Sequence, residues 1–347
     1  MKGEEKRHHT LYRQYRPSVF GEVRGQSHIV ETLERAIKHN KIAHAYLFAG
    51  GRGTGKTTVA RILARELGVH DEDLYEMDAA SNRGIDNIRE LREGAYAMPF
   101  RSPYKCYIID EAHMLTKEAW NALLKTLEEP PAHCIFVLAT TEMQKVPETI
   151  QSRCEVYTFK QPTREMLAQM MIDVGMSEGF TIDRPAAELL ALLAEGSFRD
   201  GLSVLQKVLS TSESKKINAA DVETVSGAPR SEIVRDIIRG LEKKDSVMAL
   251  KAIQQAVSEN MDPRTLAKIL IHRLRIIILM RYAGDFAQSL SEELTETDRS
   301  LAIEVAAGKV VNSDTLRTIL EAYAAMAYAA VPHLPLELAV IDLTSKS

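Results

Sequence analysis

The chain has 347 residues, of which 45% are hydrophobic, 27% charged and 6% aromatic, and its formal net charge is −4. A chain of this length and composition can bury a large core without disulfides. This indicates a globular protein of two or three domains and excludes a small disulfide-stapled scaffold. Because the net charge is slightly negative, any contact with nucleic acid must come from local basic groups or helix N-termini.

We expect no targeting signal in the N-terminal segment of this sequence. Residues 1–10 are charged and polar, and no stretch of the chain approaches the roughly 20 apolar residues that a membrane span needs. The cysteines, Cys106, Cys134 and Cys154, form no C-x-x-C pair and are interpreted as buried residues in a reducing compartment. We therefore expect a cytoplasmic protein without membrane contact, and a disordered tail over residues 1–10.

From residue 11 to residue 160, strand-like and helix-like segments alternate. Apolar residues that recur every three or four positions, such as Ile29, Leu33 and Ile37, indicate helices. Short apolar or β-branched runs, typical of strands buried on both faces, lie at Ala45–Ala49, Leu74–Asp78, Lys105–Asp110, Cys134–Thr140 and Val156–Phe159. This alternation predicts an α/β core with a five-stranded parallel sheet and right-handed crossovers.

The strand-like runs stop at Gln161-Pro162. Helices are expected at Arg164–Val174, Pro185–Ala194, Arg199–Leu209 and Ala219–Val225. Gly227-Ala228-Pro229 is interpreted as a boundary, after which Pro263 opens one long helix and Pro332 and Pro335 flank the last one. The predicted organisation is therefore an α/β core over residues 11–160, a small helical domain over 161–227 and an all-α domain over 230–345.

The segment Gly50–Thr57 matches the pattern G-x-x-x-x-G-K-[ST] of phosphate-binding loops, here called the P-loop. It follows an expected strand directly and opens an expected helix, which is the context that the pattern requires. Its glycines let backbone N–H groups turn toward phosphates, and the helix N-terminus adds partial positive charge. We expect Lys56 to reach the β- and γ-phosphates and the Thr57 hydroxyl to bind Mg²⁺. The residues expected to contact the nucleotide are Gly50, Gly51, Arg52, Gly53, Thr54, Gly55, Lys56, Thr57 and Thr58.

Asp110 and Glu111 stand at the end of the expected strand that follows the P-loop by about one βαβ unit. On its own, a strand that ends in two carboxylates fits an ordinary solvated strand end as well as it fits a catalytic site. After a P-loop, this position favours an aspartate that supports Mg²⁺ and a glutamate that polarises the attacking water. We assign Asp110 to the metal and Glu111 to the water.

Three other polar features are ambiguous by themselves. Thr140 and Thr141 end the next strand, where hydroxyl groups can sense a γ-phosphate or simply cap the strand. Arg153 and Arg199 are single arginines, which alone indicate surface ion pairs rather than catalytic groups.

Further segments resemble the AAA+ clamp-loader ATPases, and among them the gamma/tau subunits of bacterial DNA polymerase III. The similar segments, dense over residues 11–205, are Tyr12–Pro17, Phe20, Gly25-Gln26, His44–Phe48, Asp78–Asp86, Asp110–Leu115, Asn121–Pro131, Leu138–Thr141 and Ser152–Cys154. After residue 230, the chain resembles the family's collar domain in helical character and position only.

The resemblance implies roles for the ambiguous residues. Thr141 falls at the family's first sensor of the γ-phosphate, and Arg199 at the second sensor, on a helical lid. Arg153 falls in the motif whose arginine reaches the ATP of a neighbouring subunit. Such an arginine compensates charge at the transferred phosphoryl group and is worth about 10³–10⁵ in rate where it has been measured.

The adenine site is assigned by the same resemblance. Tyr12, Arg16 and Pro17, together with Val23, are implied to line it through backbone contacts. They are therefore the expected ATP-binding residues outside the P-loop.

Ser81, Asn82 and Arg83 precede an expected helix. A Ser or Asn cap exposes N–H groups that can hold a phosphate, and the family tracks duplex DNA with such helix starts. The resemblance implies that these residues contact the DNA backbone without reading its sequence. A helix cap with a solvated arginine explains them equally well, and Arg101 and Lys105 are weaker candidates for DNA contact.

Members of the family commonly carry a four-cysteine zinc module between the P-loop helix and the next strand. In this chain, Glu66–Asp73 is a short acidic connection without cysteine, so no zinc is expected. The departure suggests a streamlined lineage or kinship with other loader subunits, and it does not involve the ATP site.

The function implied by the resemblance is ATP-driven loading of a ring-shaped sliding clamp onto primed DNA. The expected cofactors are ATP and Mg²⁺. The expected partners are delta-like and delta-prime-like subunits, further gamma/tau copies, the clamp, and a junction of double- and single-stranded DNA.

Two alternatives remain. A non-hydrolysing scaffold subunit resembling delta-prime keeps the fold but loses phosphate-site residues, whereas Lys56, Asp110 and Glu111 are all present here. Another AAA+ DNA remodeller, such as a branch-migration motor, is disfavoured by the segments Asn121–Pro131 and Ser152–Cys154.

Overall fold

The computed structural model describes residues 10–283 and 293–345. The chain divides into two compact units, the first containing residues 1–166 and 196–200 and the second residues 167–195 and 201–347. The tail predicted for residues 1–10 lies outside the described residues except for Thr10. The division into three domains remains a prediction.

The first unit is built on a five-stranded parallel sheet in the order β2-β3-β4-β1-β5. The strands are β1 Ala45–Gly50, β2 Leu74–Asp78, β3 Lys105–Asp110, β4 Cys134–Thr140 and β5 Glu155–Phe159. β1, β3 and β4 are buried along almost their whole length, as expected for strands covered on both faces. The predicted five-stranded α/β core is therefore confirmed, and each strand end lies within one residue of its expected position.

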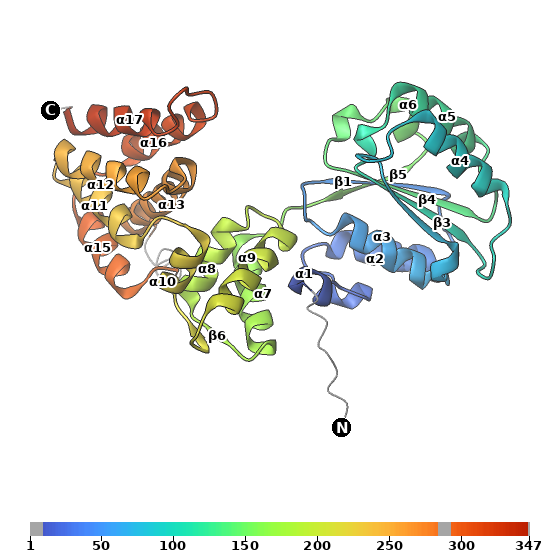
Figure 1. Ribbon diagram of the computed structural model, residues 1–347, viewed down its shortest axis with the longest axis horizontal. Coiled ribbons are helices and arrows are strands. Elements are labelled where there is room, and N and C mark those ends of the chain that lie inside the picture. Colours follow the sequence, from blue (N-terminus) through green and yellow to red (C-terminus); the bar gives the residue numbers. More distant parts are fainter. Residues whose placement is uncertain (1–9, 284–292, 346–347) are drawn as a thin grey trace. The chain divides into compact units, whose positions relative to one another are not determined.

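Helices cover both faces of this sheet. They are α1 Leu11–Gln14, α2 Ser27–Lys38, α3 Lys56–Glu66, α4 Ile85–Tyr96, α5 Lys117–Glu128 and α6 Glu148–Gln151, with one-turn 3-10 helices at Phe20–Glu22, Asp71–Asp73, Ala112–Met114 and Met143–Lys145. Figure 1 shows α2 and α3 on one face and α4, α5 and α6 on the other. Leu33 and Leu63 lie in the core on the first face, whereas Ile88 and Leu123 lie in the core on the second.

The register of the sheet brings three strand ends together. Phe48 of β1 is paired with Ala139 of β4, and Ile109 of β3 is paired with Leu138 of β4. Because neighbouring parallel strands end on the same side, the residues that follow β1, β3 and β4 meet at one edge of the sheet. This carboxyl edge is where ligands bind in open α/β sheets.

The cysteines behave as small apolar residues. Cys106 in β3 and Cys134 in β4 are buried, and Cys154 is half-buried. Burial raises the pKa of the Cys106 thiol to about 12 and that of Cys134 to about 11. These thiols are therefore protonated and unreactive at neutral pH.

The segment between residues 161 and 227 is mainly helical, with α7 Arg164–Ser177, α8 Arg184–Leu193, α9 Phe198–Thr211 and α10 Ala219–Ser226. It also contains a two-stranded parallel sheet, β6 Thr181–Ile182 and β7 Lys216–Ile217, so the expectation that strands stop at residue 161 is wrong. Each strand is held by one buried isoleucine, Ile182 or Ile217. The next residues, Asp183 and Asn218, cap α8 and α10 with their side chains.

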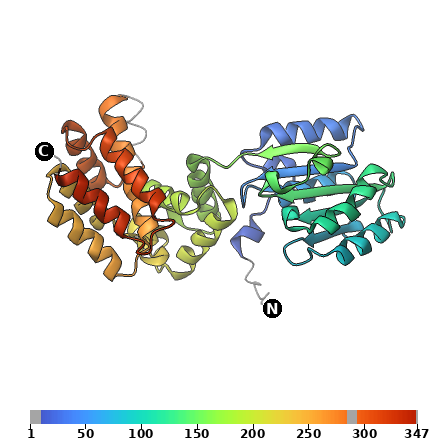
Figure 2. The same ribbon diagram turned by 90° about the horizontal axis from the view of Figure 1, so that it is seen from above.

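The remaining helices of the second unit form one bundle, visible in both views (Figures 1 and 2). They are α11 Ser231–Glu242, α12 Ser246–Ser258, α13 Pro263–Tyr282, α15 Glu296–Ala307, α16 Ser313–Ala325 and α17 Leu334–Ser345. Ile237 and Leu270 are fully buried in its core, which also takes in Leu192 of α8. Among the described residues, none of the helices combines the length and apolar character that crossing a membrane requires.

Prolines mark two of these helices. Pro263 opens α13 as predicted, next to the capping side chain of Asp262. Pro335 does not flank the last helix, because it lies inside the first turn of α17. A proline is tolerated there because the first N–H groups of a helix have no partner within it.

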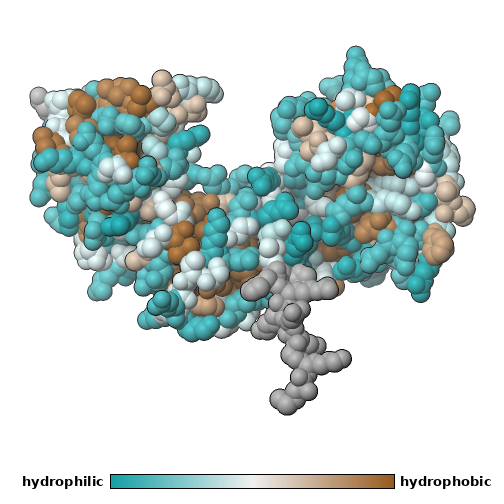
Figure 3. All heavy atoms as spheres, in the orientation of Figure 1, coloured by the Kyte–Doolittle hydropathy of each residue, from teal (hydrophilic) through white to brown (hydrophobic). Residues whose placement is uncertain are grey.

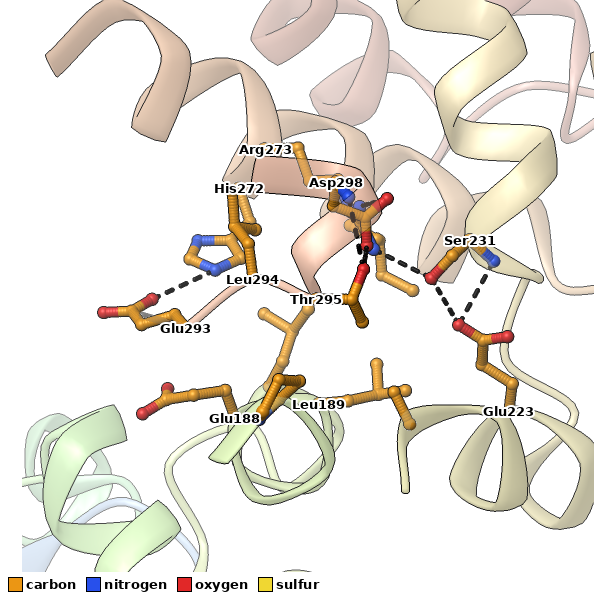
Figure 4. A pocket seen from close by; sticks show the side chains of 14 residues that line it. Glu188, Leu189, Glu223, Ser231, His272, Arg273, Glu293, Leu294, Thr295 and Asp298 are labelled. Atoms are coloured by element: carbon orange, nitrogen blue, oxygen red, sulfur yellow. Dashed lines mark hydrogen bonds and ion pairs between the residues drawn. The ribbon is translucent and has the colours of Figure 1, made fainter. Parts of the chain in front are cut away.

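A small pocket of about 40 Å³ lies within the second unit, where α8 and α10 meet the bundle (Figure 4). The hydroxyl of Ser231 donates to Glu223 Oε1 at 2.5 Å and accepts from Arg273 at 2.9 Å. Arg273 and Arg235 both pair with the buried carboxylate of Asp298. This network joins α10 to three helices of the bundle by charge-assisted hydrogen bonds.

Candidate functional site

The P-loop forms the tight turn between β1 and α3. Gly53 has φ 68° and Gly55 has φ 99°, conformations that residues with a side chain rarely adopt. Gly55 precedes the first residue of α3, so the N-terminus of the helix points its free N–H groups into the loop. The loop is therefore shaped as an anion-binding cradle.

Lys56 lies inside this cradle. Its ammonium group donates hydrogen bonds to the carbonyl oxygens of Gly50 at 2.9 Å and Gly51 at 2.7 Å. Burial lowers the pKa of Lys56, and the nearby carboxylates of Glu111 and Asp110 oppose this shift. A buried ammonium whose hydrogen bonds go to neutral carbonyls can exchange them for the stronger bonds of phosphate oxygens.

The expected metal ligands lie in direct contact. The Thr57 hydroxyl donates to Asp110 Oδ2 at 2.7 Å, across the edge between α3 and β3. The other oxygen of Asp110 accepts from the backbone N–H of Glu111 at 2.9 Å, which fixes the orientation of the carboxylate. A hydroxyl and a carboxylate are hard oxygen ligands, and this donor set fits Mg²⁺.

Glu111 begins the turn after β3 in a left-handed conformation, with φ 47°. The hydroxyl of Thr141, at the end of β4, donates to Glu111 Oε2 at 3.2 Å. Two further residues complete this cluster: His113, quoted above only as part of the similar segment Asp110–Leu115, and Glu142, which the sequence analysis did not single out. Nothing in the spacing of His113 distinguished it from the other nine of the chain's 10 histidines.

Residues 196–200 lie against the P-loop within the first unit. The N–H of Phe198 donates to the carbonyl oxygen of Gly53 at 3.1 Å, and Ser197 is buried next to it. The guanidinium of Arg199 lies over the ring of Tyr12, 5.1 Å from its centroid. Asp200 lies 3.9 Å from Arg52. The structure therefore places Arg199 and Tyr12 beside the loop, although they are far apart in the chain.

Among the other expected ATP-binding residues, Arg16, Thr54 and Thr58 make hydrogen bonds within the loop or at the start of α3. Arg16 donates to the hydroxyl of Thr58 at 3.0 Å, and burial lowers the pKa of its guanidinium. Val23 packs on the core of α2 and α3, and Pro17 is half-buried. The side chain of Thr54 is tied to the carbonyl of Gly51 at 2.9 Å.

Gln26, quoted above only as part of a similar segment, is fully buried and braces the site. Its amide nitrogen donates to the carbonyl of Lys160 at 2.7 Å, and its oxygen accepts from the N–H of the same residue at 3.1 Å. The nitrogen also lies 3.5 Å from the carbonyl of Thr54. Gln26 thus joins the end of β5 to the P-loop.

Arg153 is not among the residues gathered at the P-loop of its own chain. It donates to Glu128 of α5 at 2.8 Å and to the carbonyl of Thr149 of α6 at 2.6 Å. About a third of its side chain is exposed (34%), so the guanidinium is accessible at the surface of the first unit.

The segment expected to contact DNA differs from its prediction in detail. The residue that caps α4 is Gly84, without a side-chain hydrogen bond, so neither Ser81 nor Asn82 is the cap. The Asn82 amide instead donates to the carbonyl of Asp78, because the chain makes a turn between β2 and α4. Ser81 and Arg83 are exposed.

The prediction that Lys105 is a candidate for DNA contact is wrong. It is 5% exposed, and its ammonium donates to the carbonyls of Gly94 and Ala97 at the end of α4. A basic residue near a helix C-terminus satisfies free carbonyls and the helix dipole. Arg101 is exposed, and its backbone N–H donates to the buried carboxylate of Asp73.

The order of the sheet, the P-loop after β1 and the acidic pair after β3 define a P-loop protein with the AAA+ fold. The family model described as "DNA polymerase III, delta subunit" matches residues 25–82 and 68–163. A solved structure of the Thermotoga maritima RuvB Holliday junction branch migration motor is 22% identical with a TM-score of 0.52, covering 65% of this chain and 79% of that one. This likeness extends to the fold alone.

Curated relatives are similar to this chain over most of its length. The DNA polymerase III subunit tau of Bacillus subtilis is 35% identical over 97% of this chain and 63% of its own length. The gamma/tau subunit of Mycoplasma pneumoniae is 44% identical over 61% of this chain and 34% of its own. The gamma/tau subunit of Mycobacterium tuberculosis is 38% identical over 80% of this chain and 52% of its own. Over most of its length the chain is similar to gamma/tau subunits of bacterial DNA polymerase III, and it spans between about a third and two thirds of the length of these relatives.

Proposed function

We propose that this protein is an ATP-hydrolysing subunit of a clamp loader, which places a ring-shaped sliding clamp on primed DNA. The observation that carries the proposal is the geometry of the P-loop. Lys56 lies buried in the loop, and Thr57 contacts Asp110 at 2.7 Å. These are the groups that hold the phosphates and the metal ion of a bound nucleotide.

Bound Mg²⁺ would neutralise charge on the phosphates, with Thr57 and Asp110 as the residues that hold it. Lys56 orients the β- and γ-phosphates. Glu111 accepts a hydrogen bond from the attacking water and so orients it. Thr141 follows β4 and contacts Glu111 at 3.2 Å, and its hydroxyl is proposed to sense the γ-phosphate. We also propose that the protein functions without a zinc module.

Hydrolysis by this chain, rather than a scaffold role like that of delta-prime, is supported by the completeness of the set. A subunit that only scaffolds has no need for a lysine, a metal-binding pair and a water-orienting carboxylate at one sheet edge. Here Lys56 donates to the P-loop carbonyl of Gly51, and Asp110 accepts from both the Thr57 hydroxyl and the N–H of Glu111.

Arg153 is proposed to act on the nucleotide of a neighbouring subunit. Its ion pair with Glu128 joins side chains that are 34% and 43% exposed, and such surface pairs contribute about 0–1 kcal/mol. A phosphate of the neighbour can therefore replace Glu128 at small cost. Turnover would then require a correctly closed ring of subunits.

The second unit is proposed to hold the ring together through α17. Leu334, Leu338 and Ile341 are spaced along one face of this helix and are 44%, 52% and 42% exposed. Figure 3 shows apolar side chains gathered over α17. An exposed apolar stripe of this kind marks a protein contact, and the occupant proposed here is the matching region of another loader subunit.

DNA contact by Ser81, Asn82 and Arg83 remains a proposal with a changed physical basis. Without a side-chain cap at this helix, the contact would rest on the N-terminus of α4 and the exposed guanidinium of Arg83. Such contacts hold the phosphate backbone without reading bases.

The test is reconstitution. The full chain is combined with delta-like and delta-prime-like partners, labelled clamp, primed circular DNA and ATP, and the clamp that stays on DNA is measured. We expect loading by the wild type and by the surface control Lys38→Ala, and none by Lys56→Ala. If the chain is needed for loading but Lys56→Ala and Glu111→Gln load normally, the scaffold alternative holds. If the wild type loads no clamp, the proposal is wrong.

A further inference from the structure

His113 occupies an enclosed position between two carboxylates at the carboxyl edge of the sheet. It lies in the one-turn 3-10 helix Ala112–Met114, and only 7% of its side chain is exposed. Its Nδ1 lies 3.5 Å from Glu111 Oε2, and its Nε2 lies 3.3 Å from Glu142 Oε1. A buried ring that contacts a carboxylate on each side can fix the orientation of one carboxylate relative to the other.

The ring is also fixed to the end of β4. Its Nδ1 lies 3.2 Å from the hydroxyl of Thr140, which is fully buried and accepts the backbone N–H of Glu142 at 3.0 Å. A ring with protons on both nitrogens donates to Glu142 from Nε2 and toward Glu111 and Thr140 from Nδ1. With a proton on Nε2 alone, the ring donates to Glu142 and accepts from Thr140 but offers no donor to Glu111, so the contact with Glu111 requires the proton on Nδ1.

Glu142 gives this arrangement a fixed outer end. Its carboxylate pairs with Lys145 at 2.8 Å as well as with His113. The hydrogen bond from Lys145 is the main cause that lowers the pKa of Glu142, with a smaller contribution from His113. Glu142 therefore stays ionised and continues to attract the ring at neutral pH.

Glu111, by contrast, needs support. Its backbone is in the left-handed region, which for a residue with a side chain is an uncommon and strained conformation. Its carboxylate is about one third exposed (34%) and is oriented by the side chains of Thr141 and His113. Loss of one of these two contacts leaves several orientations open to the carboxylate.

We propose that His113 is a positioning residue for Glu111. From its place between Glu142 and Glu111, it holds the Glu111 carboxylate in line with the end of β4, the strand end that carries Thr141. The inference rests on the proposed function, because it matters only if Glu111 orients the water that attacks ATP. In this proposal, His113 and Glu142 help to align the attacking water by way of Glu111. Neither residue contacts the phosphates or the metal ion.

The experiment measures steady-state ATP hydrolysis, with primed DNA and partner subunits, alongside equilibrium binding of ATP. His113→Ala removes the ring, whereas His113→Gln keeps an amide that can still donate toward Glu142. We expect kcat to fall about 10- to 100-fold for His113→Ala, as for a catalytic group misplaced by about 1 Å, and less for His113→Gln. ATP affinity and the melting temperature should stay near wild type for His113→Gln.

Glu142→Gln tests the coupling. It should lower kcat by less than His113→Ala, and adding it to His113→Ala should have little further effect, because both changes release the same carboxylate. His133→Gln is the matched control. His133 is also partly buried, but it contacts the carbonyls of Ala95 and Ala97 near the opposite end of β4.

The outcomes separate the two proposals. If the wild type hydrolyses ATP and Glu111→Gln does not, but His113→Ala keeps wild-type kcat, then the positioning role is overturned and the proposed function stands. If kcat, ATP affinity and melting temperature fall together for both His113 variants, the role of His113 is structural and the inference is equally overturned. If the wild type shows no hydrolysis, both proposals fail.

Discussion

Gly53 is where the account of the P-loop can be tested by a single methyl group. A Cβ at this position would lie 2.0 Å from Ser197 Oγ and 2.9 Å from Ser197 Cβ, and the backbone φ is 68°. Gly55 provides the matched control, because its φ is 99° but nothing lies within 4 Å of its Cβ position. Alanine at Gly55 meets backbone strain alone, whereas alanine at Gly53 meets strain and overlap.

The two contributions have known sizes. A left-handed residue with a side chain costs about 1–2 kcal/mol, and overpacking a close contact costs about 1–3 kcal/mol. We therefore expect Gly53→Ala to lower the free energy of unfolding by about 2–5 kcal/mol and Gly55→Ala by about 1–2 kcal/mol. Adding Ser197→Gly to Gly53→Ala should restore much of the overlap part, because it removes the two nearest atoms.

The assay is urea unfolding followed by tryptophan fluorescence. The chain has 1 tryptophan, Trp120, which is 5% exposed in α5 and so reports the first unit alone. Equal losses for Gly53→Ala and Gly55→Ala, without rescue by Ser197→Gly, would refute the docking of residues 196–200 on the loop. The placement of Arg199 beside the nucleotide would then lose its physical basis.

Three further predictions concern other parts of the chain. Arg153→Ala should leave ATP binding intact and reduce DNA-stimulated turnover by about 10³-fold or more, measured in the assembled complex, and unchanged stimulation would exclude it from the mechanism. Hydrogen bonds from the N–H groups of residues 100–102 keep the pKa of the buried Asp73 carboxylate well below its usual range, despite the opposing effect of burial. Asp73→Asn should therefore lower the free energy of unfolding by about 1–3 kcal/mol at neutral pH, measured by Trp120 fluorescence. The difference between wild type and variant should shrink as the pH falls below about 4, because the wild type then loses the stability that the ionised carboxylate contributes. A difference that stays constant with pH would contradict the assignment. Leu338→Glu should weaken assembly with other loader subunits by light scattering, whereas Asp342→Ala on the same helix should not, and equal assembly of both variants would rule out the α17 stripe.

The sheet could be predicted from the sequence because burial on both faces leaves a local signal. The stretches Cys106–Ile109 and Cys134–Ala139 inside β3 and β4 are apolar, and an apolar run of this length is the local pattern of a strand covered on both faces. Similarly, the P-loop pattern is contiguous, so the contact of Lys56 with the loop follows from a few neighbouring residues.

The features that were missed depend on contacts between distant residues. β6 and β7 have two residues each and pair with each other although they are far apart in the sequence. A strand of two residues is too short to show an alternating pattern of apolar and polar residues. The buried state of Lys105 depends on where α4 ends, because its ammonium takes the carbonyl of Gly94. A lysine at the start of a strand has the same sequence context whether its side chain contacts DNA or a helix terminus.

The same limit applies within the candidate site. The contacts of His113 follow from the fold, because β3 and β4 place Glu111 and Glu142 on either side of its ring. The cap of α4 is a different case. Ser81 and Asn82 both favour a capping role by residue type, but the turn after β2 uses Asn82 to hold Asp78, and the helix begins after Gly84.

The most direct test of the central claim is the equilibrium binding of ATP to the full chain, with and without Mg²⁺. Wild-type protein should bind ATP more tightly when Mg²⁺ is present. Thr57→Ala should lose this dependence on Mg²⁺, and Lys56→Ala should lose most of the affinity under both conditions. Wild-type affinity in Lys56→Ala, or an unchanged response to Mg²⁺ in Thr57→Ala, would contradict the assignment of this loop as the nucleotide site.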